Sequence, residues 1–127
     1  MRILVVDDDV VMTKVFVVML KRTGYEVDSA GDGQMGVDMW ENGNYDLVLM
    51  DVQMPKMNGF DATRAIREKE RTRGKHTPIV AITAFALQTD EMKCRAAGMD
   101  AYLSKPVDFD NCIEMIRDLT KCRDRQA

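Results

Sequence analysis

The sequence has few of the residues that build several common kinds of site. It contains one histidine, His76, and a single histidine cannot form a histidine-based metal site or a catalytic triad. Because His76 stands in a polar run, we expect a solvent-exposed loop residue. The cysteines Cys94, Cys112 and Cys122 lack C-x-x-C spacing, so we expect them to be reduced residues that pack in the fold.

Long apolar runs and clusters of basic residues are also missing. No apolar stretch approaches the ~20 residues that a membrane-spanning helix needs, and the chain enters a predicted strand at once, without a signal peptide before it. The net charge is -3 and Lys and Arg are scattered, which provides no basic surface for a nucleic-acid backbone. We therefore expect a cytoplasmic protein that neither inserts into a membrane nor binds nucleic acid directly.

Alternation of apolar segments predicts five short strands and five helices. The predicted strands are 2–6, 26–30, 47–50, 79–83 and 101–104, and the predicted helices are 10–23, 33–42, 59–69, 87–97 and 108–123. The first, third and fourth strands are nearly continuous in Val, Ile and Leu, as in parallel strands buried on both faces, whereas the second and fifth suit sheet edges. Strict alternation predicts an open α/β sheet with helices on both faces.

Several helix ends carry their own signals. Residues suited to capping stand at four predicted ends: Gly24 and Gly98 at C-termini, Asp32 and Asp108 at N-termini. The charged stretch 68–77, before Pro78, is expected to be the most mobile connection. The length of 127 residues fits one domain, which we place at 1–123 with a short tail at 124–127.

Acidic residues follow two of the buried strands. Asp7, Asp8 and Asp9 come after the first strand, and Asp51 comes after the third. Ligands of open α/β sheets bind beyond the carboxyl ends of the strands, so three of these acids are expected at one site. Crowded carboxylates repel one another unless they share a proton or a cation, which favours a hard metal such as Mg²⁺. We expect Asp9 to be a helix cap or turn residue.

Two further polar residues belong to the same edge. The hydroxyl of Thr83, at the end of the fourth strand, can donate to a phosphoryl oxygen, and the ammonium of Lys105, after the fifth strand, can act as a movable charge on a phosphate. With a metal neutralising it, Asp51 can act as a nucleophile toward phosphorus and form an acyl phosphate. The combination predicts phosphoryl chemistry.

Four motifs make the chain resemble a response-regulator receiver domain. They are V-V-D-D at 5–8, L-M-D-V-Q-M-P-K-M-N-G at 49–59, I-T-A at 82–84 and Y-L-S-K-P at 102–106. The resemblance covers essentially the whole chain and implies a flavodoxin-like (βα)5 three-layer sandwich with strand order 2-1-3-4-5. It also implies phosphoryl transfer from a phosphohistidine to Asp51. The sequences around the last two motifs resemble receivers of hybrid histidine kinases and multistep phosphorelays more than receivers of transcription factors.

The resemblance further implies a metal site and a phosphoryl site. Mg²⁺, with Mn²⁺ as the alternative, would be held by four groups: Asp8, Asp51, the backbone carbonyl of Gln53, and Asp7 through water. Thr83 and Lys105 would hold the phosphoryl oxygens, and the Lys105–Pro106 peptide would be cis. The domain would catalyse only its own phosphorylation and dephosphorylation. We expect Gln53, Ala84 and Phe85 to tune the phosphoryl lifetime, because they flank the path of the hydrolytic water.

A route for the signal follows from the same resemblance. Tyr102 matches the aromatic switch position, and its ring could turn into space vacated behind Thr83. The surface of the fourth helix, fifth strand and fifth helix would then change, by as much as the phosphate binds one state better. A phosphorylation-dependent homodimer through this surface stays open. So does the choice between a stand-alone regulator and an excised receiver.

The implied partner is a histidine kinase or a histidine phosphotransfer domain. The first predicted helix has more apolar residues than the single stripe needed to cover a sheet. We predict that its surplus near the site, Val11, Met12 and Val15, docks the helical domain that carries the donor histidine. The alternative is a helix with an exaggerated core face.

Two other functions fit parts of the sequence. The run D-D-D-V-V at 7–11 fits the D-x-D-x-V signature of a haloacid-dehalogenase-type phosphohydrolase, with Asp7 as nucleophile and Asp9 as acid or base. That function would leave Asp51 and Lys105 without a role. A flavin-binding module of similar topology needs a Ser/Thr-rich phosphate loop after the first strand, where the acids would repel the phosphate.

Overall fold

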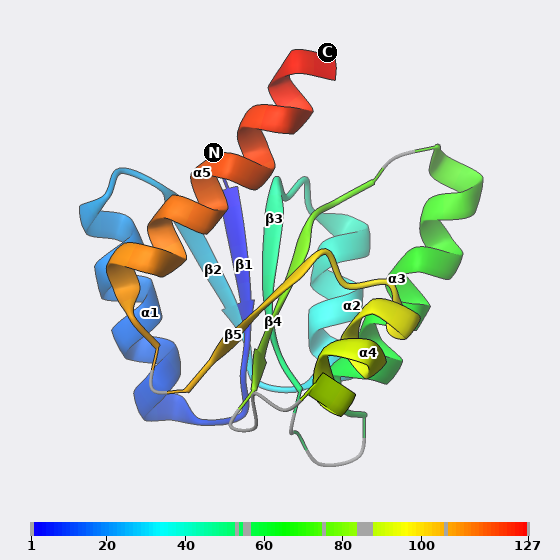
Figure 1. Cartoon of the computed structure of the whole chain (residues 1–127), viewed down its shortest axis with the longest axis horizontal. Helices are drawn as coiled ribbons and strands as arrows, with labels where there is room; N and C mark the ends of the chain where they lie inside the picture. Colours follow the sequence, from blue (N-terminus) through cyan, green and yellow to red (C-terminus); the bar gives the residue numbers. More distant parts are fainter. Residues whose placement is uncertain are drawn as a thin grey trace.

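A five-stranded parallel sheet organises the chain (Figure 1). The computed structural model describes residues 2–52, 54, 57–74, 76–83, 88–105 and 107–126, and the side chains of these residues except 88–91 and 121–126. The strands are β1 (Arg2–Val6), β2 (Glu26–Ala30), β3 (Leu47–Asp51), β4 (Ile79–Thr83) and β5 (Ala101–Ser104). Their order, β2-β1-β3-β4-β5, confirms the predicted flavodoxin-like topology and the edge positions of β2 and β5.

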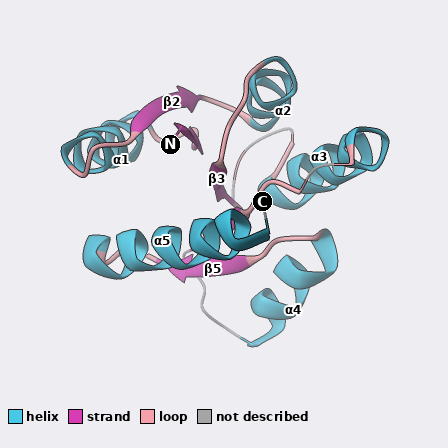
Figure 2. Ribbon diagram, turned by 90° about the horizontal axis from the view of Figure 1, so that it is seen from above, coloured by secondary structure: helices cyan, strands magenta, loops and turns pink. Residues whose placement is uncertain are grey.

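Five helices cover the two faces of the sheet. They are α1 (Val10–Arg22), α2 (Gly33–Asn42), α3 (Gly59–Arg73), α4 (Gln88–Ala97) and α5 (Phe109–Gln126). Figure 2 shows α1 and α5 on one side of the sheet and α2, α3 and α4 on the other. None of the helices described is both long and apolar enough to span a membrane.

Each face of the sheet has its own core. On one face, Phe16 and Leu20 of α1 and Ile116 of α5 pack against Ile3 and Val5. On the other face, strand residues pack against α2, α3 and α4. The strand residues are Leu4, Val6 and Val48, and the helix residues are Val37, Trp40, Ala62, Ile66 and Cys94. Successive strand residues point to opposite faces, so continuous apolar strands can supply both cores.

Helix caps confirm most of the signals in the sequence. The Asp9 side chain accepts hydrogen bonds from the N–H groups of Val11 and Met12, and the Asp32 side chain accepts from that of Met35. Four further groups complete the helix ends: the Asp108 carboxylate at α5, the Asn58 side chain at α3, and Gly24 and Gly98, which adopt positive φ after α1 and α4. Asp9 is therefore a capping residue, as predicted.

Helix α3 extends into the stretch 68–77, for which the sequence predicted a mobile connection. Helix α3 continues to Arg73 because Glu70 is anchored: its carboxylate binds the Arg67 guanidinium at 2.6 Å and the Thr77 N–H at 2.6 Å. His76 is exposed as expected, yet its Nε2 lies 2.7 Å from Asp100 Oδ1. His76 and Thr77 are thus tied to the fold by hydrogen bonds to the carboxylates of Asp100 and Glu70.

The cysteines that can be described are packing residues. Cys94 and Cys112 are buried on opposite faces of the sheet, and neither forms a disulfide. Burial raises the pKa of the Cys112 thiol to about 11. This thiol therefore stays protonated at neutral pH, which agrees with a structural role. The side chain of Cys122 lies outside the described part of the chain.

Candidate functional site

Three acids meet at the carboxyl edge of the central strands, the lower edge in Figure 1. Asp51 ends β3, and Asp7 and Asp8 follow β1, which pairs with β3 up to Val6↔Met50. One carboxylate oxygen from each of Asp7, Asp8 and Asp51 can lie within 4.8 Å of the others. Asp7 and Asp51 are buried, whereas Asp8 is exposed, so the cluster opens to solvent through Asp8.

Asp7 carries charge that the protein only partly compensates. Its Oδ1 accepts from the Asp9 N–H at 2.9 Å, whereas its Oδ2 is buried with no partner among the described groups. Burial, and secondarily the neighbouring Asp51 carboxylate, raises the pKa of Asp7 to about 6, despite the Asp9 hydrogen bond that lowers it. A buried carboxylate oxygen without a donor, beside two more carboxylates, is a donor set that fits a hard divalent cation.

A cation of the protein faces the same acids. Lys105 Nζ lies 3.6 Å from Asp51 Oδ1. The backbone N–H of Lys105 donates to the Thr83 carbonyl at 2.8 Å, which continues the β4–β5 ladder beyond Thr83↔Ser104. Thr83 is buried at the end of β4, the strand that neighbours β3. The fold therefore brings Asp51, Thr83 and Lys105 to one edge, as the sequence predicts.

The remaining predicted site residues divide into two groups. Tyr102 is half-buried in β5 and packs against the core that joins α2, α3 and α4. The others lie outside the described residues: Gln53, Ala84, Phe85 and Pro106. Three expectations that rest on these residues therefore stay predictions: the metal-binding carbonyl, the lifetime-tuning positions and the cis peptide.

The predicted docking residues on α1 differ in exposure. Val11 is 70% exposed and Val15 is 38% exposed. Met12 is half-buried, because its side chain packs against the core formed with α5. Val18 is 51% exposed and continues the stripe of Val11 and Val15 along the helix. The apolar surplus is real, but Met12 contributes less to it than its place in the sequence indicates.

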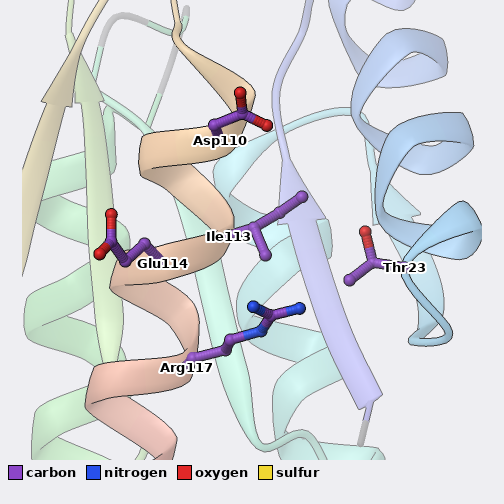
Figure 3. Close-up of a pocket in the computed structure, with 5 residues that line it drawn as sticks. All are labelled: Thr23, Asp110, Ile113, Glu114 and Arg117. Carbon is purple, nitrogen blue, oxygen red and sulfur yellow. The ribbon is translucent and has the colours of Figure 1, made fainter.

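A separate hollow of about 400 Å³ lies between the end of α1 and α5 (Figure 3). In Figure 3, Ile113 extends from α5 toward α1, and the Arg117 guanidinium points toward Thr23. Asp110 and Glu114 complete the lining. None of these residues belongs to the acidic cluster, so we assign the hollow no part in phosphoryl chemistry.

Gly59, the last residue of the motif at 49–59, is a site residue whose role was not predicted from the sequence. Its N–H donates to the Val52 carbonyl at 3.1 Å, which seats the start of α3 against the end of β3. A Cβ at this position would lie 2.9 Å from Val52 Cα and collide with the Asp51 carbonyl. The missing side chain thus lets α3 approach the backbone of the central acid.

Gly59→Ala should therefore destabilise the fold, on the order of 2 kcal/mol or more, because a backbone contact cannot move aside as a flexible side chain can. Urea unfolding measures the loss. Gly31→Ala is the matched control, since a Cβ at Gly31 meets nothing within 4 Å. Equal stability of the two variants would contradict the close approach.

Comparison with known proteins identifies a family model and a relative that match most of the chain. A family model described as "Response regulator receiver domain" matches residues 3–117. Hybrid signal transduction histidine kinase B of Dictyostelium discoideum is 42% identical over 126 residues, covering 91% of this chain but only 6% of that protein. The chain thus corresponds to a small part of that hybrid kinase.

Two solved structures have a similar fold, and one contains a bound metal ion while the other contains a protein partner. The receiver domain of sensor histidine kinase PA1611 from Pseudomonas aeruginosa, with magnesium coordinated in its active-site cleft, has a TM-score of 0.85 and 38% identity, covering 94% of this chain and 97% of that one. The receiver domain of Ssk1, co-crystallised with the histidine phosphotransfer protein Ypd1 of Saccharomyces cerevisiae, has a TM-score of 0.90 and 28% identity, covering 97% and 90%.

The matched family accounts for the geometry better than the two rivals do. The Asp9 side chain, which a haloacid-dehalogenase mechanism would use as acid or base, caps α1, whereas Asp51 lies in the acidic cluster and Lys105 faces it. Three acids at the strand ends also oppose a flavin phosphate. Topology, acidic cluster and family match together show that the chain belongs to the response-regulator receiver domains of two-component and phosphorelay signalling.

Proposed function

We propose that Asp51 accepts the phosphoryl group of a phosphohistidine on a histidine kinase or a histidine phosphotransfer domain. The observation that carries this proposal is the position of Asp51 between the acids Asp7 and Asp8 and the Lys105 ammonium. An Asp51 carboxylate oxygen forms a bond to phosphorus as the bond from phosphorus to the imidazole nitrogen breaks. The imidazole keeps the electron pair and takes up a proton, and the product on Asp51 is an acyl phosphate.

The residues present fit Mg²⁺, and Mn²⁺ by the same oxygen ligands. Asp8 and Asp51 would bind it directly with the Gln53 carbonyl, and Asp7 would act through a bound water. When bound, the ion neutralises the carboxylates and the developing phosphoryl charge. Magnesium in the cleft of the PA1611 receiver supports this assignment.

Thr83, Lys105 and Tyr102 would turn phosphorylation into a change of surface. The new phosphoryl oxygens would draw in the Thr83 hydroxyl and the Lys105 ammonium, and the half-buried Tyr102 ring would follow Thr83 inward. The α4–β5–α5 surface would then favour a second state and offer a face for a homodimer. Residues 1–123 would form this receiver, whose only catalysis concerns its own phosphoryl group.

The predicted docking residues on α1 would bind the donor domain: Val11 and Val15 through their exposed side chains, and Met12 through the part of its side chain that the core leaves open. Val15→Glu should slow transfer from a phosphorylated histidine phosphotransfer domain on the order of tenfold or more, because a charge replaces an apolar contact that must lose water. The rate of phosphoryl transfer, followed by quenching the reaction at successive times, measures the effect. Labelling by acetyl phosphate should stay at the wild-type level, since this small donor needs no docking surface.

Met35→Glu serves as the control for that prediction, because Met35 is 48% exposed on α2 and lies outside both the stripe and the α4–β5–α5 surface. Val15 is a better test position than Met12, whose substitution would also disturb the core. If Val15→Glu reduces both kinds of labelling equally, the stripe is not a docking surface.

The test of the proposed function is metal-dependent self-labelling. Incubation with acetyl phosphate and Mg²⁺ should add the mass of one phosphoryl group to the intact protein, and a chelator should prevent the addition. Release of inorganic phosphate through many turnovers, with no phosphorylated protein trapped, would favour a phosphohydrolase instead.

A further inference from the structure

Arg67 of α3 joins three parts of the fold on the side away from the acidic cluster. Its Nε donates to the Gly98 carbonyl at 2.8 Å, its Nη1 to the Thr77 carbonyl at 2.8 Å, and its Nη2 to Asp100 Oδ2 at 2.7 Å. Nη1 also pairs with Glu70 at 2.6 Å, and the side chain is only 18% exposed. Such charged, partly buried hydrogen bonds are among the stronger ones in proteins.

The partners of Arg67 are fixed in turn. The Asp100 Oδ2 atom also accepts from the Ile79 N–H at 2.8 Å, and the Asp100 N–H donates to the Ile79 carbonyl at 2.9 Å. Ile79 is the first residue of β4, and Asp100 immediately precedes β5. The arginine therefore binds the residues that lead into β4 and β5 with its two terminal nitrogens, and Gly98 with its Nε.

Gly98 is the residue that follows α4. It adopts φ +99°, and a Cβ there would lie 2.9 Å from Arg67 Cγ, so backbone and guanidinium side chain are closely packed. In the last turn of α4, the side chains of Cys94 and Ala97 are buried. The C-terminal end of α4 is thus held against α3 by packing and by a charged hydrogen bond.

We propose that Arg67 makes this end of α4 a fixed point, so that phosphorylation moves α4 as a pivot about Gly98. The inference rests on the proposed switching of the α4–β5–α5 surface and specifies how the helix moves. The signal enters at the other end, because the chain leads from Thr83 into the first residues of α4. The N-terminal half of α4 swings, while residues 97–100 keep their contacts with Arg67 in both states.

Amide NMR spectra of the wild-type protein test the pivot directly, with Mg²⁺ and beryllofluoride as the phosphoryl mimic. Shift changes should be large for residues 88–92 and small for residues 97–100. Equal changes in both segments would overturn the pivot while leaving the switch intact. Absence of beryllofluoride binding would overturn the proposed function, and the pivot with it.

Arg67→Lys tests the role of the guanidinium. A lysine keeps the charge but cannot reach four acceptors with a planar fork. Hydrogen exchange at 94–98 should accelerate at least about tenfold, and residues 97–100 should now respond to beryllofluoride, whose affinity should not change. Asp100→Asn removes the ion pair yet keeps an acceptor for Ile79, and should give a weaker form of the same response.

Arg64→Lys is the matched control on the same helix, because Arg64 is exposed and forms its ion pair within α3, with Asp61 at 3.3 Å. It should leave exchange and shifts at the wild-type values. If Arg67→Lys and Arg64→Lys behave alike, Arg67 does not hold the pivot.

Discussion

Replacing Asp51 with Asn should abolish phosphorylation of the protein, lowering transfer from a phosphorylated histidine domain by at least about a thousandfold. The amide has the shape of the carboxylate but lacks the nucleophilic oxygen. It also removes one of the three groups of the acidic cluster and the partner of Lys105. Transfer of radiolabelled phosphate from a histidine phosphotransfer domain measures the loss.

Asp9→Asn is the matched control for this prediction. Asp9 adjoins the cluster in sequence, but its side chain caps α1, and asparagine caps a helix about as well as aspartate. This variant should accept phosphate at nearly the wild-type rate. Substantial labelling of Asp51→Asn, together with loss of labelling in Asp7→Asn, would instead favour the phosphohydrolase mechanism.

Asp7→Asn should stabilise the metal-free protein at neutral pH, on the order of 1 to 3 kcal/mol. The pKa of Asp7 is raised from 3.8 to about 6, chiefly by burial. Between these values the folded protein binds more protons than the unfolded chain, so wild-type stability falls as the pH rises through this window. Asparagine does not titrate, and its amide can donate to the neighbouring Asp51.

Urea unfolding with a chelator, at pH values from below 3.8 to above 6, measures this difference between the two proteins. The advantage of Asp7→Asn should be near zero at the acid end and complete at the neutral end. Asp8→Asn, at an exposed position, should change stability little. With Mg²⁺ present, the stability advantage of Asp7→Asn over the wild-type protein should shrink or reverse, because metal binding stabilises the wild-type protein. An advantage that grows toward acid pH would contradict the burial of charge at Asp7.

The strands could be predicted almost to the residue because their apolar runs serve two cores at once. Only the end of β3 differs, where Asp51 belongs to the strand and pairs with Ile82. The meeting of Asp7, Asp8 and Asp51 followed from topology, since parallel strands that neighbour each other end at the same edge. The lysine and threonine could be placed by the same rule.

The extent of α3 could not be predicted, because it depends on contacts distant in sequence. The charged run after Lys69 has the composition of a loop, yet Glu70 is buried by pairing with Arg67 and Thr77. Arg67 in turn finds Asp100, 33 positions away. The partial burial of Met12 could not be predicted either, because helical period alone does not tell which apolar residues of α1 pack against the core formed with α5.

Chemical trapping of the phosphorylated residue tests the central claim most directly. Borohydride reduces an acyl phosphate but leaves free carboxylates unchanged, so the protein labelled with acetyl phosphate and Mg²⁺ can be reduced, digested and mapped by mass spectrometry. The account predicts one reduced position, Asp51, in the fragment that carries the end of β3. Reduction at Asp7 or Asp8 instead would contradict the assignment of Asp51 as the phosphoryl acceptor.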